Sequence, residues 1–301
     1  MFMNFADIVD AVKGGKPKAL AVAVAQDDVV LEAVTRAKQE GLAKPILIGD
    51  EKEIIAIANE AKLDIAGISI VDEPDQLKAV KAAVNLVHEG MADVLMKGLV
   101  GTADFMRGVL NKEWGLSRGK PISFVAIIDS KLVGRLLFIT DPAINTYPDL
   151  PGKVDIINNA VPVARAMGID IPKVACIAAV EVVNPKMPAT LDAACLAKMS
   201  DRGQFKNCVV DGPFAVDNAL SVLSAHHKKI NAPIAGLADI LLAPNIETGA
   251  ALYKASKYIG GCPLACVTVG AKVPLVITSR ADDADAKFYS IAGALLVSGN
   301  K

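Results

Sequence analysis

The sequence predicts an α/β protein built on mainly parallel sheets with helices on both faces. Short β-branched runs alternate along the chain with longer stretches whose apolar residues recur at helical spacing. Such alternation requires crossover connections, which cover both faces of a parallel sheet. Apolar residues make up 52% of the 301-residue chain, so it can bury a core large enough to divide into two domains.

The predicted strands are short runs rich in Val, Ile and Leu, bounded by Gly, Pro, Asn or Asp. In chain order they are 18–24, 45–48, 68–71, 93–96, 123–128, 135–139, 173–179, 207–210, 239–242, 264–269 and 275–278. Most of them are followed by a stretch with helical periodicity. Each such strand therefore predicts one parallel β-α step.

The predicted helices carry start and stop signals. Their ranges are 28–39, 75–89, 154–167, 188–202, 215–226, 246–258 and 282–297. The expected starts are Asp27, Glu73-Pro74 and Thr278-Ser279, and the expected ends are Gly41, Gly90 and Gly168. A segment dense in Pro, Gly, Asn and Asp, 140–152, is the predicted hinge.

Charge and cysteine usage exclude several classes of protein. A formal net charge of −1 gives no attraction to nucleic acid or to an anionic membrane. The N-terminal residues lack the basic region of a signal peptide, and the apolar runs are too short to span a bilayer. Five cysteines without a C-x-x-C pair predict reduced, buried thiols and a cytoplasmic protein.

Two strand-to-helix loops are candidates for anion binding, because ligands of parallel sheets lie beyond the carboxyl ends of strands. In the first loop, Gly98 and Gly101 let backbone N–H groups approach an anion, and a helix begins near Thr102. Lys97 and Arg107 would add charge-assisted contacts. The same glycines would also serve a strand-to-helix turn that binds nothing.

The second loop carries a hydroxyl and a guanidinium to a helix start. Ser279 would cap the helix or donate to an oxyanion, and Arg280 offers a planar fork suited to phosphate. Asp282 and Asp283 are expected to complement the helix dipole. Asp285 stays open as a base.

Three further residues are candidates from their neighbourhoods. Arg135, like Arg107 and Arg280, is an arginine beside a turn in a chain that otherwise favours lysine, and it is predicted to bind phosphate. Asp211 and Asn245 follow predicted strands and would either line the substrate site or cap their own turns. Zinc-ligand spacings and the G-x-G-x-x-G fingerprint are missing, which predicts neither a metal nor a dinucleotide cofactor.

Several blocks, in this order, resemble the phosphate acetyl/butyryltransferase family from about Ala19 to the C-terminus. They are KGLVGTADFMRGVL (97–110), FITDPAINTYPDL (138–150), VDGPFAVDNAL (210–220), PIAGLADILLAPNIETGAALYKASKYIGG (233–261) and TSRADDADAKFYSIAGAL (278–295). The length and the blocks within 97–150 are more similar to the butyryl branch than to the acetyl branch.

The resemblance implies a two-domain, three-layer fold like that of isocitrate and isopropylmalate dehydrogenases, with the site in the interdomain cleft. The first domain would be discontinuous, 1–140 plus 270–301, and the second would be 141–269. A homodimer is implied as well. Ser279-Arg280 matches the family's Ser-Arg pair and Arg107 its helix-start arginine. Ala286 stands where the acetyl branch has a catalytic aspartate, and Asp285 is the nearest carboxylate.

The implied reaction converts a short-chain acyl-CoA, butyryl-CoA above others, and inorganic phosphate into acyl phosphate and CoA by direct attack. Coenzyme A and phosphate are then substrates, no cofactor is needed, and an acyl kinase would consume the product. A phosphate acetyltransferase is the alternative within the family. Outside it, the alternatives are a metal- and nicotinamide-dependent hydroxyacid dehydrogenase of similar fold and a non-catalytic acyl-CoA-binding regulator.

Overall fold

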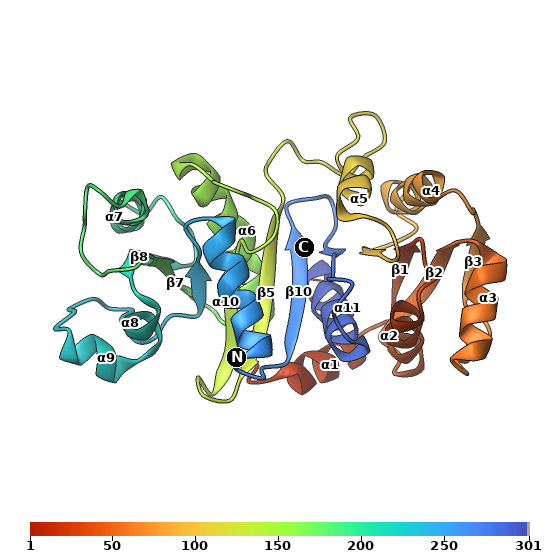
Figure 1. The fold of residues 1–301 in the computed structure, drawn as a ribbon, viewed down its shortest axis with the longest axis horizontal. Coiled ribbons are helices and arrows are strands. Elements are labelled where there is room, and N and C mark those ends of the chain that lie inside the picture. Colours follow the sequence, from red (N-terminus) through yellow and green to blue (C-terminus); the bar gives the residue numbers. More distant parts are fainter. Residues whose placement is uncertain (300–301) are drawn as a thin grey trace. The chain divides into compact units, whose positions relative to one another are not determined.

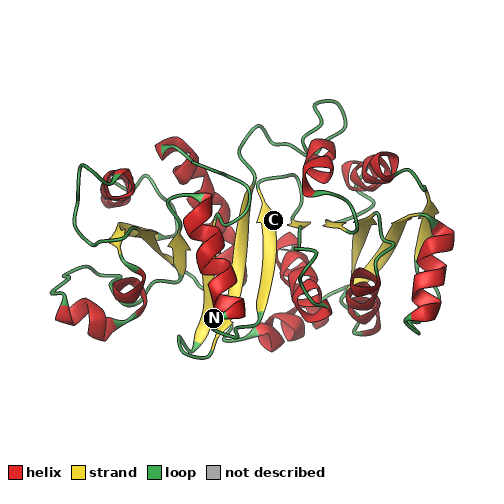
Figure 2. Ribbon diagram, viewed as in Figure 1, coloured by secondary structure: helices red, strands yellow, loops and turns green. Residues whose placement is uncertain are grey.

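A computed structural model of the protein describes residues 1–299. The chain divides into two compact units. Unit 1 comprises Met1–Asn4 and Pro121–Leu264, and unit 2 comprises Phe5–Lys120 and Ala265–Lys301. Both units consist of strands covered by helices (Figure 2), which confirms the predicted α/β class.

Unit 2 is built on a mostly parallel sheet in the order β3-β2-β1-β4-β11-β10, in which only β10 and β11 are antiparallel neighbours. Its strands are β1 (Lys18–Ala23), β2 (Ala43–Gly49), β3 (Ser69–Asp72), β4 (Val94–Lys97), β10 (Leu264–Val269) and β11 (Leu275–Val276). Its helices are α1 (Phe5–Lys13), α2 (Asp28–Gln39), α3 (Glu51–Glu60), α4 (Gln76–His88), α5 (Thr102–Val109) and α11 (Ala284–Ser298). Helices α4 and α5 cover one face, and α1, α2 and α11 pack together on the other (Figure 1).

Unit 1 contains the strand order β5-β6-β9-β7-β8, in which β5 and β6 form an antiparallel hairpin and the other pairs are parallel. Its strands are β5 (Ser123–Ser130), β6 (Arg135–Thr140), β7 (Lys173–Ile177), β8 (Val209–Phe214) and β9 (Ile240–Leu242). Its helices are α6 (Leu150–Ala166), α7 (Pro188–Asp201), α8 (Val216–Leu220), α9 (Val222–His227) and α10 (Ile246–Tyr258).

The division of the chain falls at different positions from those predicted. The sequence placed β5 and β6 in the first domain, with boundaries at 140 and 269, whereas the contacts assign both strands to unit 1. The reason is strand pairing, because β6 lies parallel to β9 over Phe138–Thr140, and β9 is central to the strand order of unit 1. The segment 140–152, predicted as a hinge, connects β6 to α6 within that unit.

Most predicted elements are present with ends shifted by a few residues, but the sequence ranges omitted α1 and α3. Helix 215–226 is split in two, since Ser221 ends α8 and caps α9. Asp27 caps α2 as predicted, while Asp75 and Asp283 cap α4 and α11 in place of the expected residues. Gly41, Gly90 and Gly168 have positive φ, which confirms them as helix ends.

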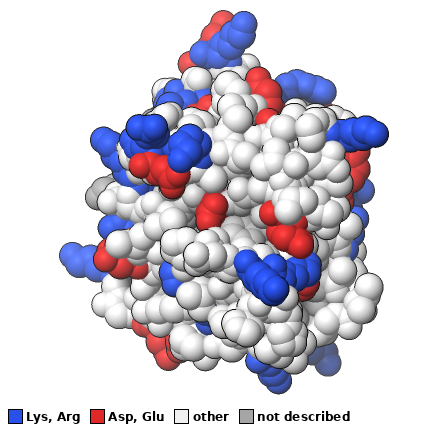
Figure 3. All heavy atoms as spheres, turned by 90° about the vertical axis from the view of Figure 1, so that its left-hand side faces the viewer, with Lys and Arg blue, Asp and Glu red and all other residues white. Residues whose placement is uncertain are grey.

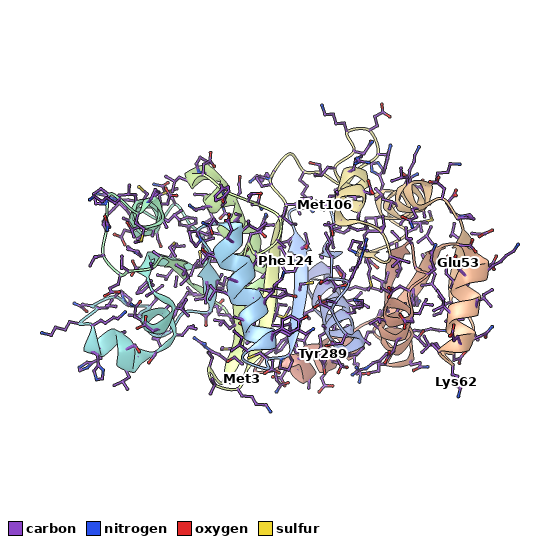
Figure 4. The ribbon with its side chains drawn as sticks, viewed as in Figure 1. Met3, Glu53, Lys62, Met106, Phe124 and Tyr289 are labelled. Atoms are coloured by element: carbon purple, nitrogen blue, oxygen red, sulfur yellow. The ribbon has the colours of Figure 1, made fainter. Side chains whose placement is uncertain are left out.

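Helix α11 anchors the core of unit 2. Tyr289, labelled in Figure 4, stacks on Phe5 of α1 with ring centroids 4.6 Å apart. The guanidinium of Arg36 on α2 lies 3.8 Å from the ring centroid of Phe288. These contacts pack the N-terminal half of α11 against α1 and α2. The loop that precedes α11 is therefore attached to a helix with a fixed position in unit 2.

Charged side chains on the face shown in Figure 3 lie in small mixed groups among uncharged atoms, as the near-zero net charge suggests. Within residues 1–299, no helix combines the length and hydropathy needed to cross a membrane. All five cysteines are unpaired thiols. Cys176 and Cys266 are buried as predicted, but Cys195 is exposed, so the prediction of burial was wrong for that residue.

Candidate active site

Three strand ends meet at one edge of the sheet in unit 2. Ala23 of β1 pairs with Lys97 of β4, and Val276 of β11 pairs with Met96 of β4, all in parallel register. The loops that follow these strands therefore emerge side by side, although they are far apart in the sequence. Both anion-binding loops predicted from the sequence lie here, together with the loop that leads to the cap of α2.

The turn after β4 passes against the backbone after β1. The N–H of Gly98 donates to Ala23 O at 2.8 Å, and the N–H of Leu99 donates to Val24 O at 2.7 Å. A Cβ atom on Gly98 would lie 2.1 Å from Val24 O, so only glycine fits. Gly101 then begins α5 without a side-chain cap. The first N–H groups of α5 are thus open to an external acceptor.

Lys97 is buried directly beneath this turn, with 4% of its surface exposed. Its ammonium donates to Gly98 O and Val100 O, both at 3.1 Å, and so holds the turn closed. Burial, with the nearby charges of Arg280 and Lys287, lowers the pKa of Lys97 to about 8. The charges of Arg280 and Lys287 disfavour a further positive charge on Lys97, and a bound anion would favour its charged form.

The loop after β11 is held just as firmly. The N–H of Ser279 donates to Asp282 Oδ2 at 2.8 Å, and Lys287 Nζ donates to Ser279 O at 3.1 Å and Asp282 O at 2.9 Å. Asp282 and Lys287 are both buried. The Ser279 hydroxyl lies at the surface and accepts from Ala281 N–H at 3.3 Å.

Arg280 is exposed, and no ion pair or hydrogen bond engages its guanidinium within residues 1–299. Its charge nevertheless acts on Lys97, which places the two cations in the same neighbourhood. Arg107, in the last turn of α5, is 72% exposed and pairs with Asp104 at 2.9 Å. Thr102 is exposed as the first residue of α5. Arg280 and Thr102 are exposed, and Arg107 could meet a ligand by leaving its surface ion pair with Asp104.

Asp285 points to a different partner. Its carboxylate accepts from Arg36 Nη1 at 2.7 Å and is 69% exposed. Arg36 is also bound to Glu40 at 2.8 Å, so the pair ties α11 to α2. This contact gives Asp285 a structural role that the sequence did not indicate.

The remaining candidates belong to unit 1. Arg135 starts β6, with its guanidinium bound to Ala238 O at 2.8 Å and 3.6 Å from an oxygen of Asp239. Asn245 follows β9 and caps α10 by accepting from Thr248 N–H. Arg135 lies at the N-terminal end of β6 and Asn245 lies beyond the C-terminal end of β9. Because these two strands are parallel, the two residues lie at opposite ends of the strands. Asp211 in β8 accepts from Gly212 N–H at 2.7 Å, and burial raises its pKa.

A family model described as phosphate acetyl/butaryl transferase matches residues 3–81 and 73–295. The chain belongs to this family. It is 55% identical over 301 residues to the phosphate butyryltransferase of Clostridium acetobutylicum, with all of both chains covered. It is 47% identical to the phosphate acetyltransferase of Thermotoga maritima, over 92% of this chain and 94% of that protein.

Solved structures of the family agree with the fold. A branched-chain phosphotransacylase from Enterococcus faecalis matches with a TM-score of 0.82 and 31% identity, over 93% of this chain and 99% of that one. A 4-hydroxythreonine-4-phosphate dehydrogenase from Klebsiella pneumoniae matches with a TM-score of 0.55 at 13% identity, a likeness in fold alone. Phosphate acyltransferases and this dehydrogenase thus share an architecture.

Two site residues escaped the sequence reasoning. Lys287 was not singled out at all, and Asp282 was assigned only to the helix dipole. The sequence does contain a feature that predicts burial of Lys287. This lysine shares one helical face with Ile291 and Ala294, and all three residues are buried. A lysine on an apolar stripe needs a buried acceptor, and the carbonyls of the preceding loop supply it.

Proposed function

We propose that the protein transfers a short-chain acyl group from coenzyme A to inorganic phosphate, with butyryl-CoA the preferred donor. The exposed guanidinium of Arg280 carries this proposal. It lies beside the Ser279 hydroxyl and is backed by the buried ammonium groups of Lys97 and Lys287. The full-length 55% identity to a phosphate butyryltransferase supports the choice of acyl group.

In the proposed reaction, an oxygen of hydrogenphosphate attacks the thioester carbonyl. A C–O bond forms, the C–S bond breaks, and the proton of the phosphate ends on the departing thiolate. Arg280 binds the phosphate, and Ser279 donates to the oxyanion of the tetrahedral intermediate. Lys97, Thr102, Arg107 and the glycine turn add positive potential and N–H donors. Both substrates react directly, so no covalent enzyme intermediate is needed.

Arg135 is left out of this phosphate site because its guanidinium already binds the backbone of Ala238 within unit 1. Asp211 and Asn245 remain proposals for binding CoA, and within unit 1 their side-chain oxygens accept from Gly212 N–H and Thr248 N–H. Asp285 is proposed as a brace between α11 and α2 instead of the general base.

We base the proposed fold type, oligomeric state, location and substrates on the family to which the chain belongs. The fold would be of the isocitrate and isopropylmalate dehydrogenase type, and the active form a homodimer in the cytoplasm. Coenzyme A and phosphate would serve as substrates without a cofactor, and an acyl kinase would use the acyl phosphate. Light scattering of the purified chain tests the dimer, since a monomer mass at assay concentration would contradict it.

A series of acyl-CoA donors tests the reaction. Thiol release from acetyl-, propionyl-, butyryl- and valeryl-CoA is followed with and without phosphate, and kcat/KM is compared. One methylene in an apolar pocket changes discrimination by about 1–3 kcal/mol, so a peak at butyryl-CoA of roughly 10-fold is expected. A peak at acetyl-CoA would favour the phosphate acetyltransferase alternative, which the 47% identity to such an enzyme also supports. Release that does not depend on phosphate would refute the proposal.

A further inference from the structure

The backbone of Ser279 is fixed by two buried side chains. Its N–H donates to Asp282 Oδ2 at 2.8 Å, and its carbonyl accepts from Lys287 Nζ at 3.1 Å. The carbonyl also accepts from Asp282 N–H at 3.2 Å, which closes a tight turn over 279–282. Both polar backbone groups of Ser279 thus face inward, while its side chain and that of Arg280 are exposed.

Lys287 is central to this arrangement. It lies in α11, only 3% exposed, and its second hydrogen bond goes to Asp282 O at 2.9 Å. One ammonium group therefore bridges the first and last carbonyls of the turn. Burial lowers the pKa of Lys287, while the nearby carboxylates of Asp282 and Asp27 oppose that shift. A buried charge of this kind is costly unless its hydrogen bonds offset the lost hydration.

We propose that Lys287 is a positioning residue, whose ammonium holds the 279–282 turn so that the Ser279 hydroxyl and the Arg280 guanidinium meet the reacting oxyanion. The inference rests on the proposed acyltransferase function. Lys287 itself touches no substrate and acts through the two carbonyls that it binds. Preorganised donors matter because a displacement of about 1 Å can cost roughly 100-fold in rate.

The matched control is a second lysine clamp on the same helix. Lys18 of β1 donates to Leu295 O at 2.7 Å and to Ser298 Oγ at 3.0 Å, at the far end of α11. Removing either ammonium breaks hydrogen bonds that brace α11. Only Lys287, however, is bound to the turn that carries Ser279. A merely structural role therefore predicts the same kinetic outcome for both substitutions.

The experiment compares Lys287→Met with Lys18→Met in the full chain. Urea unfolding gives stability, and phosphate-dependent thiol release gives kcat and KM with the best acyl-CoA. We expect both variants to lose stability, and Lys287→Met alone to lose kcat by about 10- to 100-fold with KM for acyl-CoA changed less than about threefold. Ethylammonium added to Lys287→Ala should restore part of kcat, since it can occupy the vacated position.

The outcomes separate the two proposals. Wild-type protein without phosphate-dependent release refutes the proposed function and the role of Lys287 with it. An active wild type with equal kcat in Lys287→Met and Lys18→Met overturns only the positioning role. Should Lys287→Met not fold, Lys287→Gln is used, because its polar side chain is one bond shorter than that of lysine and cannot keep both hydrogen bonds to Ser279 O and Asp282 O. A kcat for that variant equal to wild type would count against the inference.

Discussion

At the scale of single residues, the site depends on which charged groups are already engaged. Asp285 and Arg135 are bound to protein partners, whereas Arg280 has none within residues 1–299. A guanidinium left without a partner beside two buried ammonium groups has an electrostatic reason to bind an anion. In the sequence, Asp285, Arg135 and Arg280 all lie near predicted turns. The sequence therefore could not show which of them bind protein partners.

Arg280→Ala should lower phosphate-dependent thiol release by on the order of 100-fold, because the guanidinium that binds and orients the attacking phosphate is lost. Arg280→Lys keeps the charge but not the planar fork, so an intermediate rate is expected. Arg202→Ala, at the end of α7 in unit 1, is the surface control. The values of kcat and kcat/KM for phosphate decide the matter, and unchanged values of both in Arg280→Ala would remove this residue from the site.

Lys97 should make stability depend on pH. Its pKa is lowered to about 8 in the folded protein, against an ordinary value of 10.5. Between these values the unfolded chain binds more protons, so the free energy of unfolding rises with pH from about 8 to about 10.5. Urea unfolding across this range measures the slope. Lys97→Met should flatten it, and an identical slope in the variant would contradict the assignment.

Asp285→Asn should leave thiol release within about threefold of wild type, because loss of an exposed ion pair costs only about 0–1 kcal/mol. The carboxylate belongs to the brace between α11 and α2. Turnover of CoA and acyl phosphate in the reverse direction is the sharper assay, since that direction requires a thiol to lose its proton. A loss of several hundredfold there would restore Asp285 as the base.

At the scale of elements, the site is made by adjacent strand ends. β4 lies between β1 and β11, and the register Val276↔Met96 brings the loop of Ser279 beside the turn of Gly98. Helix α11 then returns Lys287 beneath its own preceding loop. Each loop is thus fixed by a buried lysine that donates to backbone carbonyls.

Gly98→Ala tests whether the close contact between the turn after β4 and the backbone after β1 is needed for stability and activity. The added Cβ would stand 2.1 Å from Val24 O, so the backbone must move. We expect a loss of about 1–3 kcal/mol in the free energy of unfolding, together with lower activity. Gly14→Ala is the control, because its nearest atom would be 3.7 Å away. Equal stability of the two variants would show that the close approach has no consequence.

At the scale of the whole molecule, the chain forms two compact units that each have their own core. Within residues 1–299, no group of three or more His, Cys, Asp or Glu residues is placed to hold a metal ion. The proposed reaction needs only the two substrates and the donors of the protein.

Exhaustive treatment with EDTA should leave thiol release within about twofold of the untreated rate, because the proposed reaction uses no metal-bound nucleophile or Lewis acid. Addition of Mg²⁺ to the treated protein serves as the reference. A rate that collapses with EDTA and returns with Mg²⁺ would contradict the proposal that no metal takes part. A change in NAD absorbance with a hydroxyacid would favour the dehydrogenase alternative.

Local sequence patterns were enough to predict the α/β class, most strands and helices, and the two loops that carry Lys97 and Ser279-Arg280, because periodicity and glycine turns are local features. It did not find α1 or α3, or the shared sheet of β5, β6 and β9. The ion pair of Asp285 with Arg36 and the hydrogen bond of Lys287 to Ser279 became visible only in the folded chain. Such pairings depend on strand order and burial, which bring distant residues together and which no local pattern records.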